Sequence, residues 1–158
     1  MGRRSWSLPA SVSGCLFNAG LQEMNEPKAK NAGSSQSGGA LIYVVDDEPM
    51  LLELASVILE PLGYTIETFR APETALRAFT AADPPPALVI TDYAMHTMSG
   101  LELAEACRRI RPQQRVLLLS GTVGADIFRN APVRPDRFLA KPYQSKQLIE
   151  AVEATLAN

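Results

Sequence analysis

Four apolar runs in this sequence each end in polar side chains that could do chemistry together. These side chains are Asp46 and Asp47, Asp92, Ser120, and Lys141. If the runs are parallel strands of one open sheet, the polar groups converge at its carboxyl edge, where such sheets bind ligands. Clustered carboxylates repel one another, and a hard divalent cation such as Mg²⁺ relieves that repulsion. A carboxylate can also accept a phosphoryl group, whose oxygens an ammonium group and a hydroxyl can contact. The pattern therefore predicts a site for a divalent cation and a phosphoryl group.

The elements that must position these groups alternate between strand-like runs and helical periods. We expect five strands, at Leu41–Val45, Tyr64–Phe69, Ala87–Thr91, Val116–Leu119 and Arg137–Ala140. We expect five helices, at about Pro49–Glu60, from Pro72, from about Ser99, at Gly124–Ala131 and at about Ser145–Leu156. This alternation indicates an α/β domain with a parallel sheet. The helix at Gly124–Ala131 is the least well supported, because Pro132 and Pro135 would end it early.

Helical spacing also predicts which side chains the helices bury. For the first helix these are Leu51, Leu54, Ala55, Ile58 and Leu59. For the third helix they are Leu103, Ala104, Cys107 and Ile110. Ser99, with Glu102 three residues later, predicts a capping box at the start of that third helix.

Length and charge predict one domain behind a tail. Of the 158 residues, 1–39 carry four basic and two acidic side chains, and we expect them to form a disordered leader and linker. Residues 40–158 carry eleven basic and fifteen acidic side chains, so an acidic domain gives no electrostatic case for direct nucleic-acid binding. No apolar run approaches the ~20 residues of a membrane span. Cys15 and Cys107 indicate no disulfide framework, which favours a reducing, cytoplasmic location.

From about Ala40 to its end, the chain resembles the receiver domain of two-component response regulators. The matching segments are Val44–Glu48, Asp92–Met95, Met98–Gly100, Leu119–Gly121 and Phe138–Tyr143. They occur in the family's order, with 45 residues from Asp47 to Asp92, 28 to Ser120 and 21 to Lys141. The resemblance implies that residues 40–158 form a single doubly wound, flavodoxin-like domain. Its five-stranded parallel sheet would have the order 2-1-3-4-5 and be flanked by five helices.

The resemblance also implies a role for each acidic residue. Asp92 would be the phosphoacceptor and would bind Mg²⁺ directly. Asp47 and the backbone carbonyl of Ala94 would be the other direct ligands, and Asp46 would contact the cation through water. Mg²⁺ would be the cofactor.

The remaining matched residues would act on the phosphoryl group and on the output surface. Lys141 would contact the phosphoryl group, and the Lys141–Pro142 bond would be cis. Ser120 would be the switch hydroxyl that moves toward the phosphoryl group. Phe138 would be the switch aromatic that turns inward on phosphorylation.

The implied function is that of a stand-alone phosphorelay protein rather than an enzyme with an external substrate. Asp92 would take a phosphoryl group from a phosphohistidine of a sensor kinase or a phosphotransfer protein. The output would pass through the face of the fourth helix, fifth strand and fifth helix to an unknown protein target. Because no output domain follows Asn158, we expect no direct nucleic-acid partner; phosphorylation-dependent dimerisation is left open.

Other interpretations of the same residues remain open. A degenerate receiver would use the domain only for protein contacts. A Mg²⁺-dependent aspartyl phosphatase uses similar residues, but its nucleophile lies in an Asp-x-Asp motif on the first strand, and Asp92 has no such partner. A nucleotide-binding fold is disfavoured, because no Gly-rich loop follows the first strand. Asp46 and Asp47 could also simply cap the first helix.

Two further features have a functional and a plain interpretation. His96, the only histidine, occupies a loop position where the family usually has proline. It is either a tolerated substitution or a pH-sensitive group near the phosphorylation site. Arg129, Arg134 and Arg137 either meet an acidic partner or form a solvated face.

Overall fold

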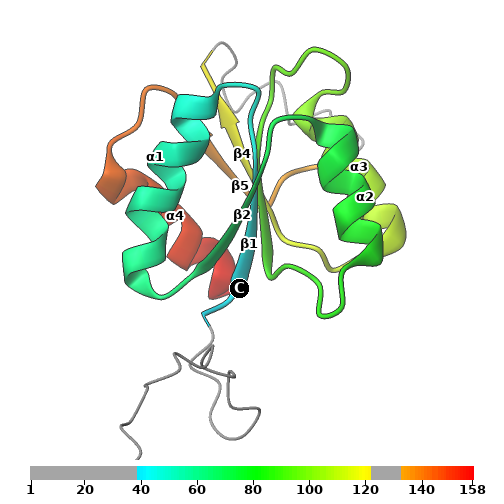
Figure 1. The fold of residues 1–158 in the computed structure, drawn as a ribbon, viewed down its shortest axis with the longest axis horizontal. Coiled ribbons are helices and arrows are strands. Elements are labelled where there is room, and N and C mark those ends of the chain that lie inside the picture. The colour runs from blue at the N-terminus through cyan, green and yellow to red at the C-terminus, as the bar shows by residue number, and fades with distance from the viewer. Residues whose placement is uncertain (1–38, 122–132) are drawn as a thin grey trace, which may run out of the picture. The chain divides into compact units, whose positions relative to one another are not determined.

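A five-stranded parallel sheet forms the centre of the computed structural model, which describes residues 39–121 and 133–158 (Figure 1). The strands are β1 Leu41–Val45, β2 Thr65–Phe69, β3 Leu88–Asp92, β4 Val116–Ser120 and β5 Arg137–Ala140. All neighbouring strands are parallel, in the order β2-β1-β3-β4-β5. The predicted fold class and strand order are therefore confirmed, with strand ends that differ by one residue in places.

Helices cover both faces of this sheet. They are α1 Pro49–Leu59, α2 Pro72–Ala81, α3 Gly100–Ile110 and α4 Ser145–Leu156, with a 3₁₀ turn at Glu60–Leu62. Figure 1 shows α1 and α4 on one face and α2 and α3 on the other. The described residues thus contain four of the five expected helices. The fifth, Gly124–Ala131, lies outside them, in residues 122–132.

Local sequence explains where the helices begin and end. Pro49 and Pro72 occupy the first turns of α1 and α2, where proline's missing N–H leaves no bond unmade. Gly63 follows the 3₁₀ turn with a φ of 93°, a left-handed conformation that glycine adopts without strain. At α3, Ser99 and Glu102 form the predicted capping box. These local signals determine where the helices that follow the strands begin and end.

The strands supply two separate cores, because successive side chains point to opposite faces of a sheet. Ile42 and Val44 of β1 face α1 and α4, together with Leu148 and Val152. On the other face, Phe79 is the largest fully buried side chain, and it packs with residues of β1, β3 and α3. With both faces covered, β3 and β4 are buried along their whole length. The predicted site at their ends therefore rests on rigid strands.

The buried faces of α1 and α3 were predicted only in part. On α1, Leu52, Ala55 and Leu59 are buried, whereas Leu54 is 41% exposed. Apolar residues occupy nearly every side of this helix, so spacing alone cannot select the buried one, and Leu54 lies about 200° around the helix from Leu52. On α3, Ile110 is 43% exposed because it is the last helical residue. These two expectations were wrong.

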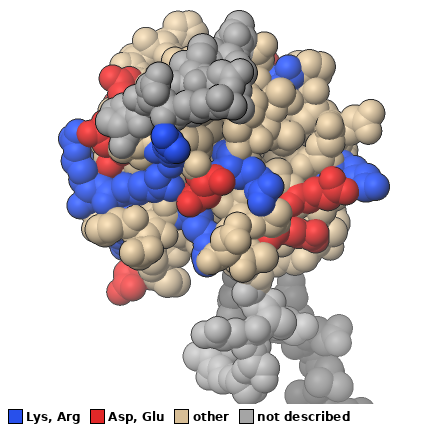
Figure 2. Space-filling model, turned by 180° about the vertical axis from the view of Figure 1, so that it is seen from behind, with Lys and Arg blue, Asp and Glu red and all other residues tan. Residues whose placement is uncertain are grey.

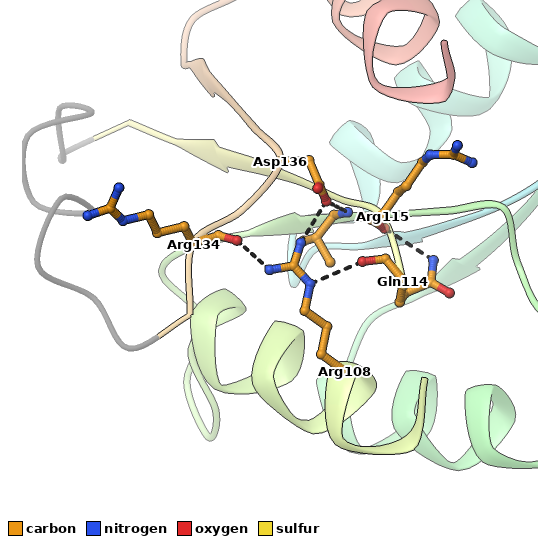
Figure 3. A network of polar contacts seen from close by, with 6 residues as sticks. Arg108, Gln114, Arg115, Arg134 and Asp136 are labelled. Atoms are coloured by element: carbon orange, nitrogen blue, oxygen red, sulfur yellow. Dashed lines mark hydrogen bonds and ion pairs between the residues drawn. The ribbon is translucent and has the colours of Figure 1, made fainter. Parts of the chain in front are cut away.

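A polar network joins α3 to the start of β4 and to the residues before β5 (Figure 3). Arg108 donates to the carbonyl oxygens of Gln114 (3.1 Å) and Arg134 and to a carboxylate oxygen of Asp136 (2.7 Å). The same Asp136 oxygen accepts a hydrogen bond from the backbone N–H of Val116 at 2.6 Å. This contact lies at the amino end of β4, opposite the predicted site. The contact between Asp136 and Val116 therefore holds β4 and β5 together at the end of the strand pair that lies away from the predicted site.

We expect Asp136→Ala to lower the free energy of unfolding by about 2 kcal/mol, because it removes charge-assisted hydrogen bonds and leaves the buried Val116 N–H without its acceptor. Urea unfolding measures this loss. Glu105→Ala is the matched control, since Glu105 also pairs with an arginine, but on the surface of α3. That control is expected to lose less than about 0.5 kcal/mol. Equal losses in the two variants would contradict the structural role of Asp136.

The surface seen in Figure 2 carries Lys and Arg side chains interspersed with Asp and Glu. Two arginines of α3 pair with carboxylates, Arg108 with Asp136 and Arg109 with Glu105. Arg134, whose carbonyl oxygen belongs to this network, and Arg137 are both exposed, and Arg129 lies outside the described residues. Among the residues described, no helix has the length and apolar character needed to cross a membrane.

Candidate functional site

The carboxyl ends of β1 and β3 bring two buried carboxylates to one ammonium group. Asp46, just after β1, is 1% exposed, and Asp92, the last residue of β3, is 6% exposed. The Lys141 Nζ, from the turn after β5, lies 2.8 Å from Asp46 Oδ2 and 2.8 Å from Asp92 Oδ1. Three of the predicted site residues, separated by up to 95 positions in sequence, are therefore in direct contact.

Backbone N–H groups hold the other oxygen of each carboxylate. Asp92 Oδ2 accepts from the N–H of Ala94 at 2.9 Å, and Asp46 Oδ1 accepts from the N–H of Glu48 at 2.9 Å. The N-cap of α1 is Glu48, which makes no side-chain capping bond. Asp46 thus turns its second oxygen to Lys141 rather than acting only as a helix cap. Both carboxylates are oriented by fixed donors.

The charges in this site are unbalanced and shift the pKa of the lysine. Burial alone would lower the pKa of Lys141, but its hydrogen bonds and charge interactions with Asp46 and Asp92 outweigh burial and raise it. Lys141 is therefore charged at neutral pH. One ammonium faces two carboxylates, which leaves a net negative charge that a cation can bind.

Asp47 points to a different partner. Its Oδ2 lies 2.8 Å from Nδ1 of His96, whose side chain is 88% exposed. Sequence reasoning singled out His96 but named no partner, because the contact joins the loops after β1 and β3. Both loops lie at the carboxyl edge, so the contact places Asp47 at the same end of the sheet as Asp46.

Ser120 and Phe138 lie on the two strands nearest the lysine. Ser120, at the end of β4, is 2% exposed, and its carbonyl accepts a hydrogen bond from the N–H of Lys141 at 2.8 Å. Phe138 is half-buried on β5, paired in register with Leu118 of β4. The Lys141–Pro142 peptide bond is cis, as the resemblance implied. A backbone hydrogen bond thus joins Ser120, the predicted switch residue, to Lys141.

The donor set fits a hard divalent cation. Mg²⁺ takes a few carboxylate oxygens, keeps several waters and completes its shell with substrate phosphate. Asp46, Asp47 and Asp92 supply such oxygens at one edge. Within residues 39–121 and 133–158, no three acidic, histidine or cysteine side chains are arranged so that they could hold a metal ion together. This agrees with their contacts, since Lys141 and His96 occupy carboxylate oxygens that a cation would share.

Comparison with known proteins identifies a family. The model of the response regulator receiver domain matches residues 42–153. The transcriptional regulatory protein KdpE of Mycobacterium tuberculosis is 28% identical over 116 residues, which are 73% of this chain and 50% of KdpE. RegA, a photosynthetic apparatus regulatory protein of Cereibacter sphaeroides, is 32% identical over 117 residues, 73% of this chain and 61% of RegA. The chain thus spans about half the length of the first of these curated relatives.

Solved structures agree with this match. A receiver domain from Clostridium thermocellum has a TM-score of 0.69 at 28% identity, covering 75% of this chain and 94% of that one. The response regulator TrrA of Thermotoga maritima, in complex with Mg²⁺ and BeF, has a TM-score of 0.65 at 31% identity, covering 73% of this chain and 98% of that one. The chain belongs to the response regulator receiver domain family of two-component systems.

Proposed function

We propose that this protein is a phosphorelay response regulator whose Asp92 accepts a phosphoryl group from a phosphohistidine. The observation that carries the proposal is the contact of one buried lysine with two buried carboxylates at the ends of adjacent strands. A lysine placed there can neutralise a phosphoryl oxygen on Asp92. Phosphoryl transfer depends mainly on such positioning and charge stabilisation.

The transfer exchanges one bond to phosphorus for another. A carboxylate oxygen of Asp92 attacks the phosphorus, the bond from phosphorus to the histidine nitrogen breaks, and an acyl phosphate forms. Lys141 contacts a phosphoryl oxygen, and Ser120 donates its hydroxyl to another. Water later attacks the phosphorus, the bond from phosphorus to the Asp92 oxygen breaks, inorganic phosphate leaves, and the Asp92 carboxylate is restored. The acyl phosphate resides on the protein, so this chemistry serves signalling rather than conversion of an external substrate.

Mg²⁺ would be held by Asp47, Asp92 and the Ala94 carbonyl, with Asp46 acting through water. The relative TrrA was solved with Mg²⁺ and BeF, which supports this assignment. When bound, the cation neutralises charge that builds up on the phosphoryl oxygens. Loss of Mg²⁺ by chelation is therefore expected to stop phosphorylation.

The output would pass through the expected face of the fourth helix, β5 and α4, where α4 is the fifth helix expected from the sequence. The fourth expected helix, Gly124–Ala131, lies outside the described residues. Phe138 and Leu139 of β5 and Gln147, Glu150 and Ala151 of α4 line a shallow groove on that face. A turn of Phe138 on phosphorylation would change the shape of this groove and shift the protein between two packings. The target is a protein, and phosphorylation-dependent dimerisation through this face belongs to the same proposal.

The proposal is tested by phosphotransfer. A sensor-kinase histidine domain, autophosphorylated with radiolabelled ATP and freed of nucleotide, is mixed with the full chain and Mg²⁺. We expect label to move to the wild-type chain and not to an Asp92→Asn variant. A wild-type chain that takes no label from a panel of such donors would favour a receiver used only for contacts. The phosphatase alternative predicts steady release of phosphate from small phosphomonoesters, which the relay does not.

Loss of His96 is expected to strengthen Mg²⁺ binding slightly. The imidazole holds Asp47 Oδ2, and a cation must displace it. Since exposed pairs are worth at most about 1 kcal/mol, we expect His96→Asn to tighten Mg²⁺ binding by less than about fivefold. Calorimetric titration with MgCl₂ measures the change. Weaker Mg²⁺ binding in this variant would contradict the competition.

A further inference from the structure

His96 and Asp47 are a pair of metal-binding groups, only one of which the proposed Mg²⁺ site uses. Nδ1 of His96 lies 2.8 Å from Oδ2 of Asp47. Two ligands that each lie about 2.1 Å from one ion, at a right angle to each other, are about 3 Å apart. The imidazole nitrogen and the carboxylate oxygen therefore already have the separation of neighbouring ligands, and a single ion can take both with little movement of either loop.

The loop that carries His96 is held in place on both sides of the histidine. Met95 and Met98 pack against the core beneath α2 and α3. The N–H of Gly100 donates to the carbonyl oxygen of Tyr93 at 3.0 Å and closes the loop. The His96 side chain itself is 88% exposed, so dissolved ions reach its ring. The imidazole is thus both positioned and accessible.

An imidazole beside the carboxylate changes which cation the site prefers. Mg²⁺ is a hard ion that takes oxygen ligands and keeps several waters, so it binds Asp47 only after it displaces His96. Zn²⁺ binds imidazole nitrogen and carboxylate oxygen alike, and N/O sites bind it more tightly than most divalent ions. Zn²⁺ can therefore keep both members of the pair. The net negative charge of Asp46 and Asp92 facing the single Lys141 ammonium attracts either ion.

We propose that Asp47 and His96 together bind Zn²⁺, in competition with Mg²⁺ for the same carboxylate. This inference rests on the proposed function, which assigns Asp47 to Mg²⁺. Among the residues that the structure describes, no third acidic, histidine or cysteine side chain is arranged to join the pair. Water and backbone carbonyl oxygens therefore complete the shell of the ion. Such an open shell makes Zn²⁺ an exchangeable ligand rather than a closed structural centre.

The test compares the untagged full chain with His96→Asn, Asp47→Asn and Thr97→Ala. Thr97 is the matched control, since it is exposed in the same loop but hydrogen-bonds to Glu73 of α2. Zn²⁺ and Mg²⁺ are titrated separately by calorimetry at one fixed pH, and Zn²⁺ is titrated again in saturating Mg²⁺. Because His96 is the only histidine of the chain, its ring nitrogen resonances in NMR report directly on metal ligation.

We expect His96→Asn to weaken Zn²⁺ binding by about tenfold or more, since losing even an outer partner of a metal ligand usually costs that much. The same variant is expected to bind Mg²⁺ slightly more tightly, so its effects on the two ions have opposite signs. Asp47→Asn should weaken the binding of both ions, and Thr97→Ala should change neither. Zn²⁺, but not Mg²⁺, should shift the ring nitrogen resonances of the wild type, and saturating Mg²⁺ should weaken Zn²⁺ binding.

Two results would overturn the shared Zn²⁺ site. Equal Zn²⁺ affinities in the wild type and His96→Asn, or ring resonances that stay unshifted in saturating Zn²⁺, would show that the imidazole is not a ligand. Zn²⁺ affinity that is unchanged in saturating Mg²⁺ would show that the two ions do not compete for Asp47. Mg²⁺ binding by the wild type in either case would leave the proposed function intact. A wild type that binds Zn²⁺ through His96 but binds no Mg²⁺ would uphold the pair and contradict the Mg²⁺ assignment of the proposed function.

Discussion

Lys141→Met is expected to slow phosphorylation of Asp92 by acetyl phosphate about a hundredfold, the usual effect of removing one group that stabilises developing charge. Lys141 is the ammonium that contacts both buried carboxylates, at 2.8 Å each. Methionine keeps most of the length and apolar contacts of the side chain but removes its charge. The phosphorylation rate, followed by intact mass over time, measures this loss.

The same substitution is expected to destabilise the fold. Without Lys141, Asp46 and Asp92 stay buried with no counter-charge, and breaking such a pair costs about 3 kcal/mol. Lys146→Met is the matched control, since Lys146 is 83% exposed and lies 3.8 Å from Glu150 on α4. We expect that control to change the free energy of unfolding by less than about 0.5 kcal/mol. A Lys141→Met protein as stable and as reactive as this control would contradict the central role of Lys141.

The contribution of Lys141 to stability has a defined pH dependence. Folding raises the pKa of Lys141 above its usual value of 10.5. The protonated lysine therefore stabilises the fold fully below about pH 10.5 and loses this effect as pH rises through the higher folded value. Burial also raises the pKa values of Tyr43, Tyr143 and Cys107, the last to about 11. Because these groups also disfavour the folded state once they ionise, the wild type and every variant lose free energy of unfolding at alkaline pH. The difference between wild type and Lys141→Met should shrink above pH 10.5.

Gly100→Ala is expected to have the second large effect, because α3 begins directly against β3, the strand that ends in Asp92. A Cβ at Gly100 would lie 2.2 Å from the backbone oxygen of Asp92 and 2.7 Å from Leu118 Cδ1. The backbone of β3 cannot yield without moving the Asp92 carboxylate. We expect a loss of about 2–3 kcal/mol in the free energy of unfolding and slower phosphorylation.

Gly121→Ala provides the matched control for this substitution. Among the described residues, the atom nearest to a Cβ at Gly121 would be Lys141 Cβ at 3.8 Å, an ordinary contact, although Gly121 also lies beside the site. Urea unfolding and the acetyl phosphate rate should both stay near wild type. If Gly100→Ala and Gly121→Ala behave alike, the close approach of α3 to β3 does not position Asp92.

Sequence alone predicted the strands and the convergence of Asp46, Asp92 and Lys141. This was possible because parallel strands buried on both faces form short apolar runs, and the polar residue that ends each run marks the same edge of the sheet. The start of α3 was also predictable, since the capping box of Ser99 and Glu102 is a local signal.

Other features depended on the folded chain. The buried face of α1 was ambiguous because apolar residues surround that helix. The ion pair of Asp47 with His96 joins two loops whose paths no short-range pattern specifies. The bonds from Arg108 to Asp136 join α3 to a segment 28 residues later in the sequence.

Intact-mass analysis after incubation with acetyl phosphate tests the central claim most directly. The full chain and an Asp92→Asn variant are compared with Mg²⁺ and with a chelator. We predict one phosphoryl adduct on the wild-type chain, present only with Mg²⁺ and absent from Asp92→Asn. An adduct that persists in Asp92→Asn would place the phosphoryl group on another residue. No adduct on the wild-type chain, from acetyl phosphate or from a phosphohistidine donor, would contradict the assignment of Asp92 as the acceptor.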